Sequence, residues 1–258
     1  MKIYRKGISI LISVALLATN AIGKGDDPEL KEQINWESFL SRHDLVWERA
    51  PDDYFNAPFL GNGLLGAMLY KPIDEAMRLD VGRMDVVEHR KTDARSIVDN
   101  GRLPVGYFTL DMNYDLKDAS GRLDLYNAEA NINIVAANGQ SITLRTLVFR
   151  AHDAILVEFE KPAGLQCNWT FHPEPSIVPR NPKVGTRYLN PPPECSKVDG
   201  INICTQKRDA GGSYTTAWKV RDAGNNVERL IITVQDSYPG SESIASVHQI
   251  TNYRQHHD

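Results

Sequence analysis

The feature that most constrains the fold is a pair of short alternating segments joined by a turn, between Ala130 and Phe149. Apolar residues recur at every second position on both sides of Asn138-Gly139: Ile132, Ile134, Ile142 and Leu144. A period of two is that of a strand with one buried face. Asn-Gly supplies the two positive-φ positions of a tight turn. The segment is therefore predicted to form an antiparallel β-hairpin.

Other segments of this kind recur along the chain, with turn residues between them. The further strand candidates are Leu64–Tyr70, Ala76–Val81, Tyr107–Tyr114, Ala154–Phe159 and Leu230–Val234. No alternation of strand and helix appears, which argues against a parallel sheet. The predicted fold class is all-β: a large antiparallel two-sheet sandwich of the supersandwich type, spanning residues 43–240.

A proline-rich segment interrupts these strands. Seven of the chain's 14 prolines lie between His172 and Glu194. Such density excludes helix interiors and central strands. Two interpretations stay open: a surface excursion without a ligand, and a rim loop that contacts another domain or a sugar.

The two ends of the chain have compositions of their own. Residues 1–23 have a basic start followed by an apolar run and small residues, the layout of a secretory signal peptide, so the mature chain is expected to be periplasmic or secreted. The apolar run is short for a membrane anchor, and no membrane association is expected after cleavage. Residues 24–42 are a lead-in segment, expected to hold a short helix that packs on the core. Residues 241–258 have weak helical periodicity and are expected to begin a linker helix.

Charge and cysteine content exclude some classes of function. The net charge of −4, without a basic stripe, gives no reason to expect nucleic acid. Cys195 and Cys204 are the closest pair of the three cysteines, and an oxidising compartment would permit a disulfide between them. The third, Cys167, has no metal-binding spacing to another cysteine or to histidine.

Two neighbouring segments carry a resemblance to a known enzyme family. Asp44–Pro51 contains Trp47, and Ala57–Tyr70 contains the run Leu-Gly-Asn-Gly-Leu-Leu-Gly-Ala-Met. The pair is similar to the opening of glycoside hydrolase family 95, the α-L-fucosidases and their α-galactosidase relatives, in which a Trp precedes a Pro-Leu-Gly-Asn-Gly-x-Leu-Gly-Ala-Met strand. Phe59 departs from this pattern, because the family has Pro directly before Leu.

Three later segments resemble further elements of the family in the same order. They are Gly101–Leu110, Gly121–Leu125 and Arg150–Asp153. The resemblance runs from Trp47 to about Phe159 and implies the β domain that precedes an (α/α)6 catalytic barrel. The family's catalytic residues lie in that barrel, so no catalytic, cofactor-binding or metal-binding residue is assigned in this chain. The implied partners are the barrel of the parent protein and a glycan, and this chain alone is expected to be inactive.

The best local candidates for acid–base chemistry are Asp80, Asp85 and Glu88, close to His89. Glycoside hydrolysis uses two carboxyl groups that flank the scissile bond. The other interpretation, which we favour, makes these carboxylates solvated loop charges paired with basic neighbours. Those neighbours are Arg83, Arg90 and Lys91. The tryptophan that the family carries in this stretch is absent.

The remaining motifs are weaker. Gly61, Gly63 and Gly66 are expected to allow positive φ and close backbone approach, and they are not a dinucleotide motif because no helix follows. Three tryptophans could stack on sugars but are expected to lie in the core: Trp47, Trp169 and Trp218. Asn168-Trp169-Thr170 is a glycosylation acceptor only in a eukaryotic secretory route. The expected function is a supporting domain of an exported glycoside hydrolase, and the alternatives are a carbohydrate-binding module and a scaffold without sugar contact.

Overall fold

The computed structural model of the protein describes residues 34–73, 76–91, 100–180 and 188–240. The chain divides into two compact units, residues 1–39 and residues 40–258. The described part of the first unit forms most of helix α2 (Trp36–Leu40), which has no buried residue. The predicted signal peptide (1–23) and the predicted linker helix (241–258) lie outside the described residues.

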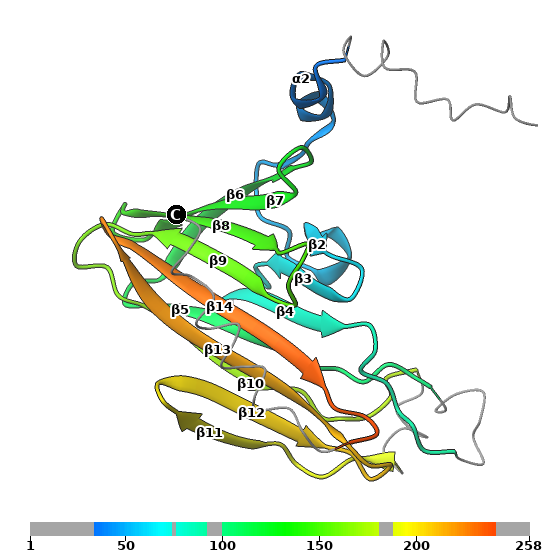
Figure 1. Ribbon diagram of the computed structural model, residues 1–258. Helices are drawn as coiled ribbons and strands as arrows, with labels where there is room; N and C mark the ends of the chain where they lie inside the picture. The colour runs from blue at the N-terminus through cyan, green and yellow to red at the C-terminus, as the bar shows by residue number, and fades with distance from the viewer. Residues whose placement is uncertain (1–33, 74–75, 92–99, 181–187, 241–258) are drawn as a thin grey trace, which may run out of the picture. The chain divides into compact units, whose positions relative to one another are not determined.

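The described part of the second unit is a sandwich of two antiparallel sheets, as predicted (Figure 1). Sheet A has nine strands in the order β1 (Leu45–Trp47), β6 (Leu116–Asp124), β7 (Glu129–Ala136), β8 (Ser141–Val148), β9 (Ile155–Glu160), β14 (Val227–Asp236), β13 (Ser213–Gly224), β12 (Ile201–Lys207) and β11 (Glu194–Val198). Sheet B has five strands in the order β10 (Cys167–Pro173), β5 (Gly106–Met112), β4 (Met77–Arg83), β3 (Leu65–Tyr70) and β2 (Phe59–Gly61). Two short 3-10 helices, η1 (Ser41–His43) and η2 (Tyr54–Asn56), precede β1 and β2.

The core lies between the two sheets, because every second residue of the central strands points inward. Strand β4 alternates buried and half-buried residues along its whole length. The largest buried side chains of the core are aliphatic and aromatic residues from both sheets: Phe108, Phe159, Leu65, Leu69, Leu79, Leu110, Ile132 and Leu144. Burying each such side chain contributes about 1.5–3 kcal/mol. This packing fixes the face that sheet B turns away from the core.

The predicted hairpin is present as β7 and β8, but its turn differs from the prediction. Only Gly139 has positive φ (86°), and Asn138 does not. The Gly139 N–H donates to the Ala136 carbonyl at 2.9 Å, and the Ala136 N–H donates to the Gln140 carbonyl at 2.8 Å. These bonds enclose a three-residue loop that ends with glycine in the left-handed region, a common hairpin connection.

Several strands were not predicted, although two of their turns carry a local signal. Asp199 and Gly200, between β11 and β12, have φ of 51° and 77°. Asn225 and Asn226, between β13 and β14, have φ of 53° and 63°. Two consecutive positive-φ residues are the mark of a type I′ hairpin. Of the strands beside these turns, only β14 was predicted; β11, β12 and β13 contain too many polar residues for alternation to reveal them.

The proline-rich segment is described on both sides of residues 181–187. Pro173 is the last residue of β10, an edge strand, where a missing backbone N–H is tolerated. Beyond it Ser176 and Asn190 are 1% and 2% exposed, and the Asn190 side chain donates to the Ser176 hydroxyl at 3.0 Å. The described part of this segment therefore contains residues that are buried and hydrogen-bonded to one another.

Candidate functional site

The outer face of sheet B presents one continuous row of side chains across all five strands. Direct cross-strand pairing joins each residue to the next, and paired residues of an antiparallel sheet share a face. The row reads Phe59, Met68, Asp80, Tyr107 and His172. Strand β2 contributes an aromatic ring and strand β4 a carboxylate, so the row combines apolar and polar groups.

A second row on the same face has no side chains. Gly61 pairs with Gly66, and Gly66 pairs with Gly82. Of the motif glycines, only Gly63 has positive φ (93°), so the predicted role of Gly61 and Gly66 in positive-φ backbone is wrong. Gly61 and Gly66 instead leave this part of the sheet surface without side chains. Together with loop residues they form the floor of a groove of about 590 Å³.

Both apolar and polar side chains line the groove. The apolar ones include Tyr54, Phe59 and Met84, which are 49%, 64% and 55% exposed. The polar ones include Asp80, Arg102 and Glu174. Such a mixture of apolar walls with a few convergent polar groups is typical of binding sites for small molecules.

Hydrogen bonds hold the two carboxylates of the groove in place. The Arg78 guanidinium donates to Asp80 through Nε at 2.6 Å and to Glu174 through Nη2 at 3.2 Å. The Tyr70 hydroxyl donates to Asp80 at 3.0 Å. Burial first and the Asp80 charge second raise the pKa of Tyr70, which stays a donor. Asp80 is therefore a positioned hydrogen-bond acceptor.

Stacked rings extend this network along the face. The Arg78 guanidinium lies over the Tyr107 ring at 3.5 Å, and Tyr107 stacks on His172 with ring centroids 4.9 Å apart. The Thr109 hydroxyl lies 2.8 Å from Nε2 of His172. Cation–π and stacking contacts of this kind limit side-chain freedom. The middle of the outer face is therefore preorganised before any ligand arrives.

The predicted carboxylate cluster is not one site. Asp80 belongs to the groove, and its partner is Arg78, which the sequence analysis did not name. Asp85 pairs with Arg83 at 2.7 Å. Arg83 is 8% exposed and also binds Asp153 at 2.9 Å, so it ties β4 to sheet A. This ion pair is structural.

Glu88 is fully buried, and its predicted place among solvated loop charges is wrong. Its carboxylate accepts from the Arg90 guanidinium at 2.7 Å, from the Arg90 N–H at 2.9 Å and from the Asn190 amide at 3.3 Å. A buried charge persists only when it is paired and hydrogen-bonded. Glu88 thus anchors the proline-rich segment to the loop after β4.

His89 packs against residues other than those that surround the carboxylates of the groove. Its ring stacks on Tyr238, with centroids 3.5 Å apart and an interplanar angle of 9°. Beside it Arg208 and Asp236 form a buried pair with two hydrogen bonds, at 2.6 and 2.7 Å. Burial, followed by the Arg208 charge, lowers the pKa of His89. His89 is therefore favoured as a neutral ring in the fold.

The segments that carry the family resemblance meet in space. Asn62, at the centre of the Gly-Asn-Gly run, accepts from the N–H groups of Leu64 and Leu65 at 2.9 and 2.8 Å. Its amide donates to the carbonyls of Phe149 and His152 at 3.1 and 3.3 Å, in the corner that ends β8. One asparagine thus joins the first motif to the last.

Trp47 makes a second connection of this kind. It pairs directly with Gly121 in the β1–β6 ladder. A β-carbon built on Gly121 would lie 2.5 Å from Cδ1 of Ile132, so a side chain there would force the Ile132 side chain to move. Trp47 is half-buried beside a hollow of about 340 Å³. The first motif therefore also contacts the Gly121–Leu125 segment.

Trp169 lies in the core, Trp218 packs against it partly buried, and Trp36 is 47% exposed on α2, whereas the glycosylation acceptor lies on an edge strand. Trp169 is 8% exposed, and Trp218 packs on Phe171 with centroids 5.1 Å apart. Asn168 and Thr170 are exposed on β10, where the Thr170 hydroxyl donates to Asp111 at 3.0 Å. Trp169 and Trp218 are thus not the exposed platform of a sugar site.

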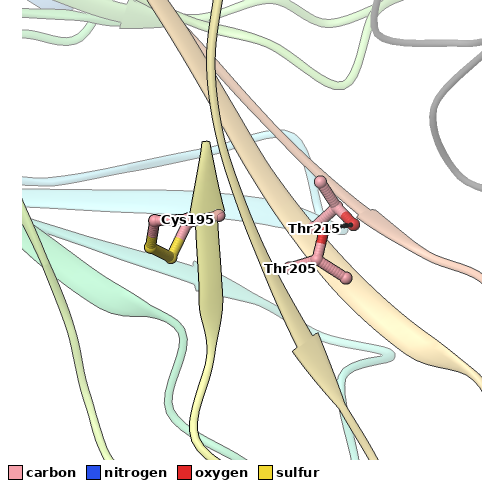
Figure 2. The surroundings of a disulfide bond; sticks show 4 residues. Cys195, Thr205 and Thr215 are labelled. Atoms are coloured by element: carbon pink, nitrogen blue, oxygen red, sulfur yellow. Dashed lines mark hydrogen bonds between the residues drawn. A yellow bond between two sulfur atoms is a disulfide. The ribbon is translucent and has the colours of Figure 1, made fainter. Parts of the chain in front are cut away.

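Cys195 and Cys204 form a disulfide between the edge strand β11 and its neighbour β12 (Figure 2). Beside it, the hydroxyls of Thr205 and Thr215 lie 3.1 Å apart across β12 and β13. Cys167 is free and buried, and burial raises the pKa of its thiol to about 11. The described residues contain no cluster of His, Cys, Asp and Glu placed to hold a metal ion. Within the same residues, no helix has the length and apolar character that crossing a membrane requires.

Fold and groove together define the class of protein: an antiparallel two-sheet β-sandwich with an open groove on the outer face of its smaller sheet. Among models of known protein families, none matches the chain. A search of curated proteins likewise finds no match.

Proposed function

We propose that this chain is the non-catalytic N-terminal β-sandwich of an exported glycoside hydrolase that resembles the α-L-fucosidases of family 95. It would support an adjoining (α/α)6 catalytic domain and shape one side of the glycan site. The observation that carries the proposal is the Asn62 side chain, which bonds to the corner containing His152. Residues that resemble separate family motifs, 90 positions apart, are used together in one contact.

The other motifs behave in the same way. Trp47 pairs with Gly121, so the first motif also contacts the Gly121–Leu125 segment. Segments that resembled the family only by chance would have no reason to contact one another in the fold. Their convergence supports the proposal that this is the fold the family motifs specify.

The arrangement of carboxylates supports a non-catalytic role. A general acid in a glycosidase sits in apolar surroundings that keep it protonated, opposite a second carboxylate. Asp80, Asp85 and Glu88 each accept hydrogen bonds from an arginine instead. Asp80 and Glu174, the two carboxylates of the groove, are bound to the same guanidinium. Their geometry fits positioning and hydrogen bonding.

Export is part of the proposal. The disulfide between Cys195 and Cys204 supports it, because such bonds persist in oxidising compartments. N-terminal sequencing of the protein from its native compartment should give a start near Lys24. Material that retains Met1 would contradict cleavage of residues 1–23.

The test of the supporting role is an assay on aryl α-L-fucosides and aryl α-galactosides. This chain alone should be inactive, and a polypeptide that also carries the adjoining helical domain should hydrolyse one of them. Activity of this chain alone that disappears in Asp85→Asn or Glu88→Gln would place catalysis in the β-sandwich and overturn the proposal. Inactivity of both polypeptides would remove the fucosidase assignment.

A further inference from the structure

Phe59 occupies an unusual position on the outer face of sheet B. A β-carbon built on Gly61 would lie 3.3 Å from Cζ of Phe59, and one built on Gly66 would lie 3.4 Å from its Cε2. The ring therefore rests directly on the backbone of two glycines that pair across β2 and β3. Side chains at these positions would displace it. The two glycines thus leave a flat backbone surface against which the Phe59 ring packs.

The Phe59 ring nevertheless remains exposed to solvent. Phe59 is 64% exposed, although it contacts the sheet on one side. An exposed aromatic ring of this size is costly to leave in water and is enriched at binding surfaces. This is also the residue at which the chain departs from the family pattern. The exposed ring is consequently a feature of this chain's own sequence.

The polar groups near the ring balance one another in charge. The carboxylates of Asp80 and Glu174 accept hydrogen bonds from the Arg78 guanidinium, and Arg102 lines the same groove. Within the described part of the chain, no carboxylate forms an ion pair with Arg102, whose Nη2 lies 3.4 Å from a β-carbon built on Gly82. Asp80, Glu174 and Arg102 line the groove, and Arg78, which binds both carboxylates, completes two charges of each sign. The groove therefore favours neither an anion nor a cation. A neutral ligand rich in hydrogen-bonding groups fits best.

The spacing suits a ligand of more than one ring. Phe59 on β2 and Asp80 on β4 are two strands apart, which corresponds to about 10 Å. The groove volume of about 590 Å³ is within the range of sites for small organic ligands. A saccharide has an apolar ring face for Phe59 and hydroxyls for the carboxylates and guanidinium, and a chain of two rings would cover both.

We propose that this groove is a non-catalytic binding site for a neutral oligosaccharide. One sugar ring stacks on Phe59, and hydroxyls of the next bond to Asp80, Glu174 and Arg102. The site goes beyond the supporting role proposed above, which would stand without it. The binding site is tested by equilibrium binding of an oligosaccharide, whereas the supporting role is tested by hydrolysis with the longer polypeptide. The two proposals can therefore fail separately.

The experiment begins with this chain on an array of neutral and anionic oligosaccharides. The strongest neutral ligand is then titrated by calorimetry, with lactose and cellobiose as reference probes. Phe59→Ala should weaken binding by about tenfold, the loss expected when a stacked aromatic contact is removed. Phe55→Ala is the matched control, because Phe55 is 88% exposed and lies outside the groove. It should leave the affinity unchanged.

Further variants separate stacking from folding. Phe59→Trp keeps an aromatic face and should retain binding, and Arg102→Gln should weaken it by about threefold or more through loss of a charged donor. Thermal melts of every variant establish that the sandwich is intact. The absence of binding by any neutral sugar would overturn the proposal, as would equal effects of Phe59→Ala and Phe55→Ala. Binding of anionic sugars alone would overturn it too. If Phe59→Ala left sugar binding intact and weakened only association with the helical domain, the groove would be a docking surface between domains instead.

Discussion

Replacing Asn62 by alanine tests whether the family-like motifs are held together by one side chain. Asn62 makes four hydrogen bonds: it accepts from the N–H groups of Leu64 and Leu65 and donates to the carbonyls of Phe149 and His152. Each intramolecular hydrogen bond contributes about 0.5–1.5 kcal/mol net. Leu65 is buried, so its N–H would lose its partner without easy access to water.

The expected loss follows from these four contacts. Their simple sum is about 4 kcal/mol, but contacts of one side chain are not additive and water can reach the half-buried carbonyls. We therefore expect Asn62→Ala to lower the free energy of unfolding by about 2–3 kcal/mol. Asn62→Asp should be no better, since it keeps the acceptor but places a carboxylate against two carbonyl oxygens.

The assay is equilibrium unfolding in urea, with the midpoint and slope fitted together. Asn138→Ala is the control, because among the residues that the structure describes the Asn138 side chain bonds only to Gln140, at 3.0 Å to its N–H and 2.7 Å to its side chain, in an exposed turn. It should cost less than about 1 kcal/mol. Equal losses for Asn62→Ala and Asn138→Ala would refute the reasoning, because the long-range bonds of Asn62 would then contribute nothing.

Three further predictions follow from the geometry. Gly139→Val should destabilise the sandwich by about 1 kcal/mol or more in a urea titration, because valine is strained at φ of 86°, and an unchanged midpoint would contradict the turn assignment. Because its pKa is lowered in the fold, His89 takes up a proton at a higher pH in the unfolded chain than in the folded protein. The stability that the neutral ring contributes is therefore present at about pH 8 and is lost toward about pH 5. His89→Gln should reduce the stability difference between these two pH values, and an identical pH profile would count against it. Cys167 should be unreactive toward a thiol reagent in the folded protein and reactive after denaturation, so rapid labelling of the native protein would show that it is not buried as described.

The sequence determined the fold class and the local elements that carry their own pattern. Alternation around Asn138-Gly139 is a property of neighbouring residues, and it placed β7 and β8 correctly. The same reasoning found parts of β3, β4, β5, β9 and β14 and excluded helical crossovers between parallel strands. Local pattern was sufficient because β4 and β8 alternate buried and more exposed residues, whereas β9 and β14 contain continuous apolar runs.

Strands with polar residues on buried faces escaped this reasoning. β13 begins with Ser213-Tyr-Thr-Thr-Ala, and Thr215 and Thr216 are buried. Their burial depends on partners from other strands, as in the Thr205–Thr215 contact across β12 and β13, which alternation within one strand cannot reveal. The burial of Glu88 likewise depends on Asn190, 102 positions away. Polar residues look exposed in a sequence until their distant partners are known.

The candidate site shows the same division most clearly. The sequence supplied Phe59, the motif glycines and Asp80, but it gave no reason to place them on one surface. Register alone sets Gly61 opposite Gly66 and Gly66 opposite Gly82, and a shift by one residue would turn each of them to the other face. That register is fixed by the inward-facing residues of β3 and β4, which pack against sheet A. The groove therefore exists only because the core, on the opposite face of the same strands, decides which residues point outward.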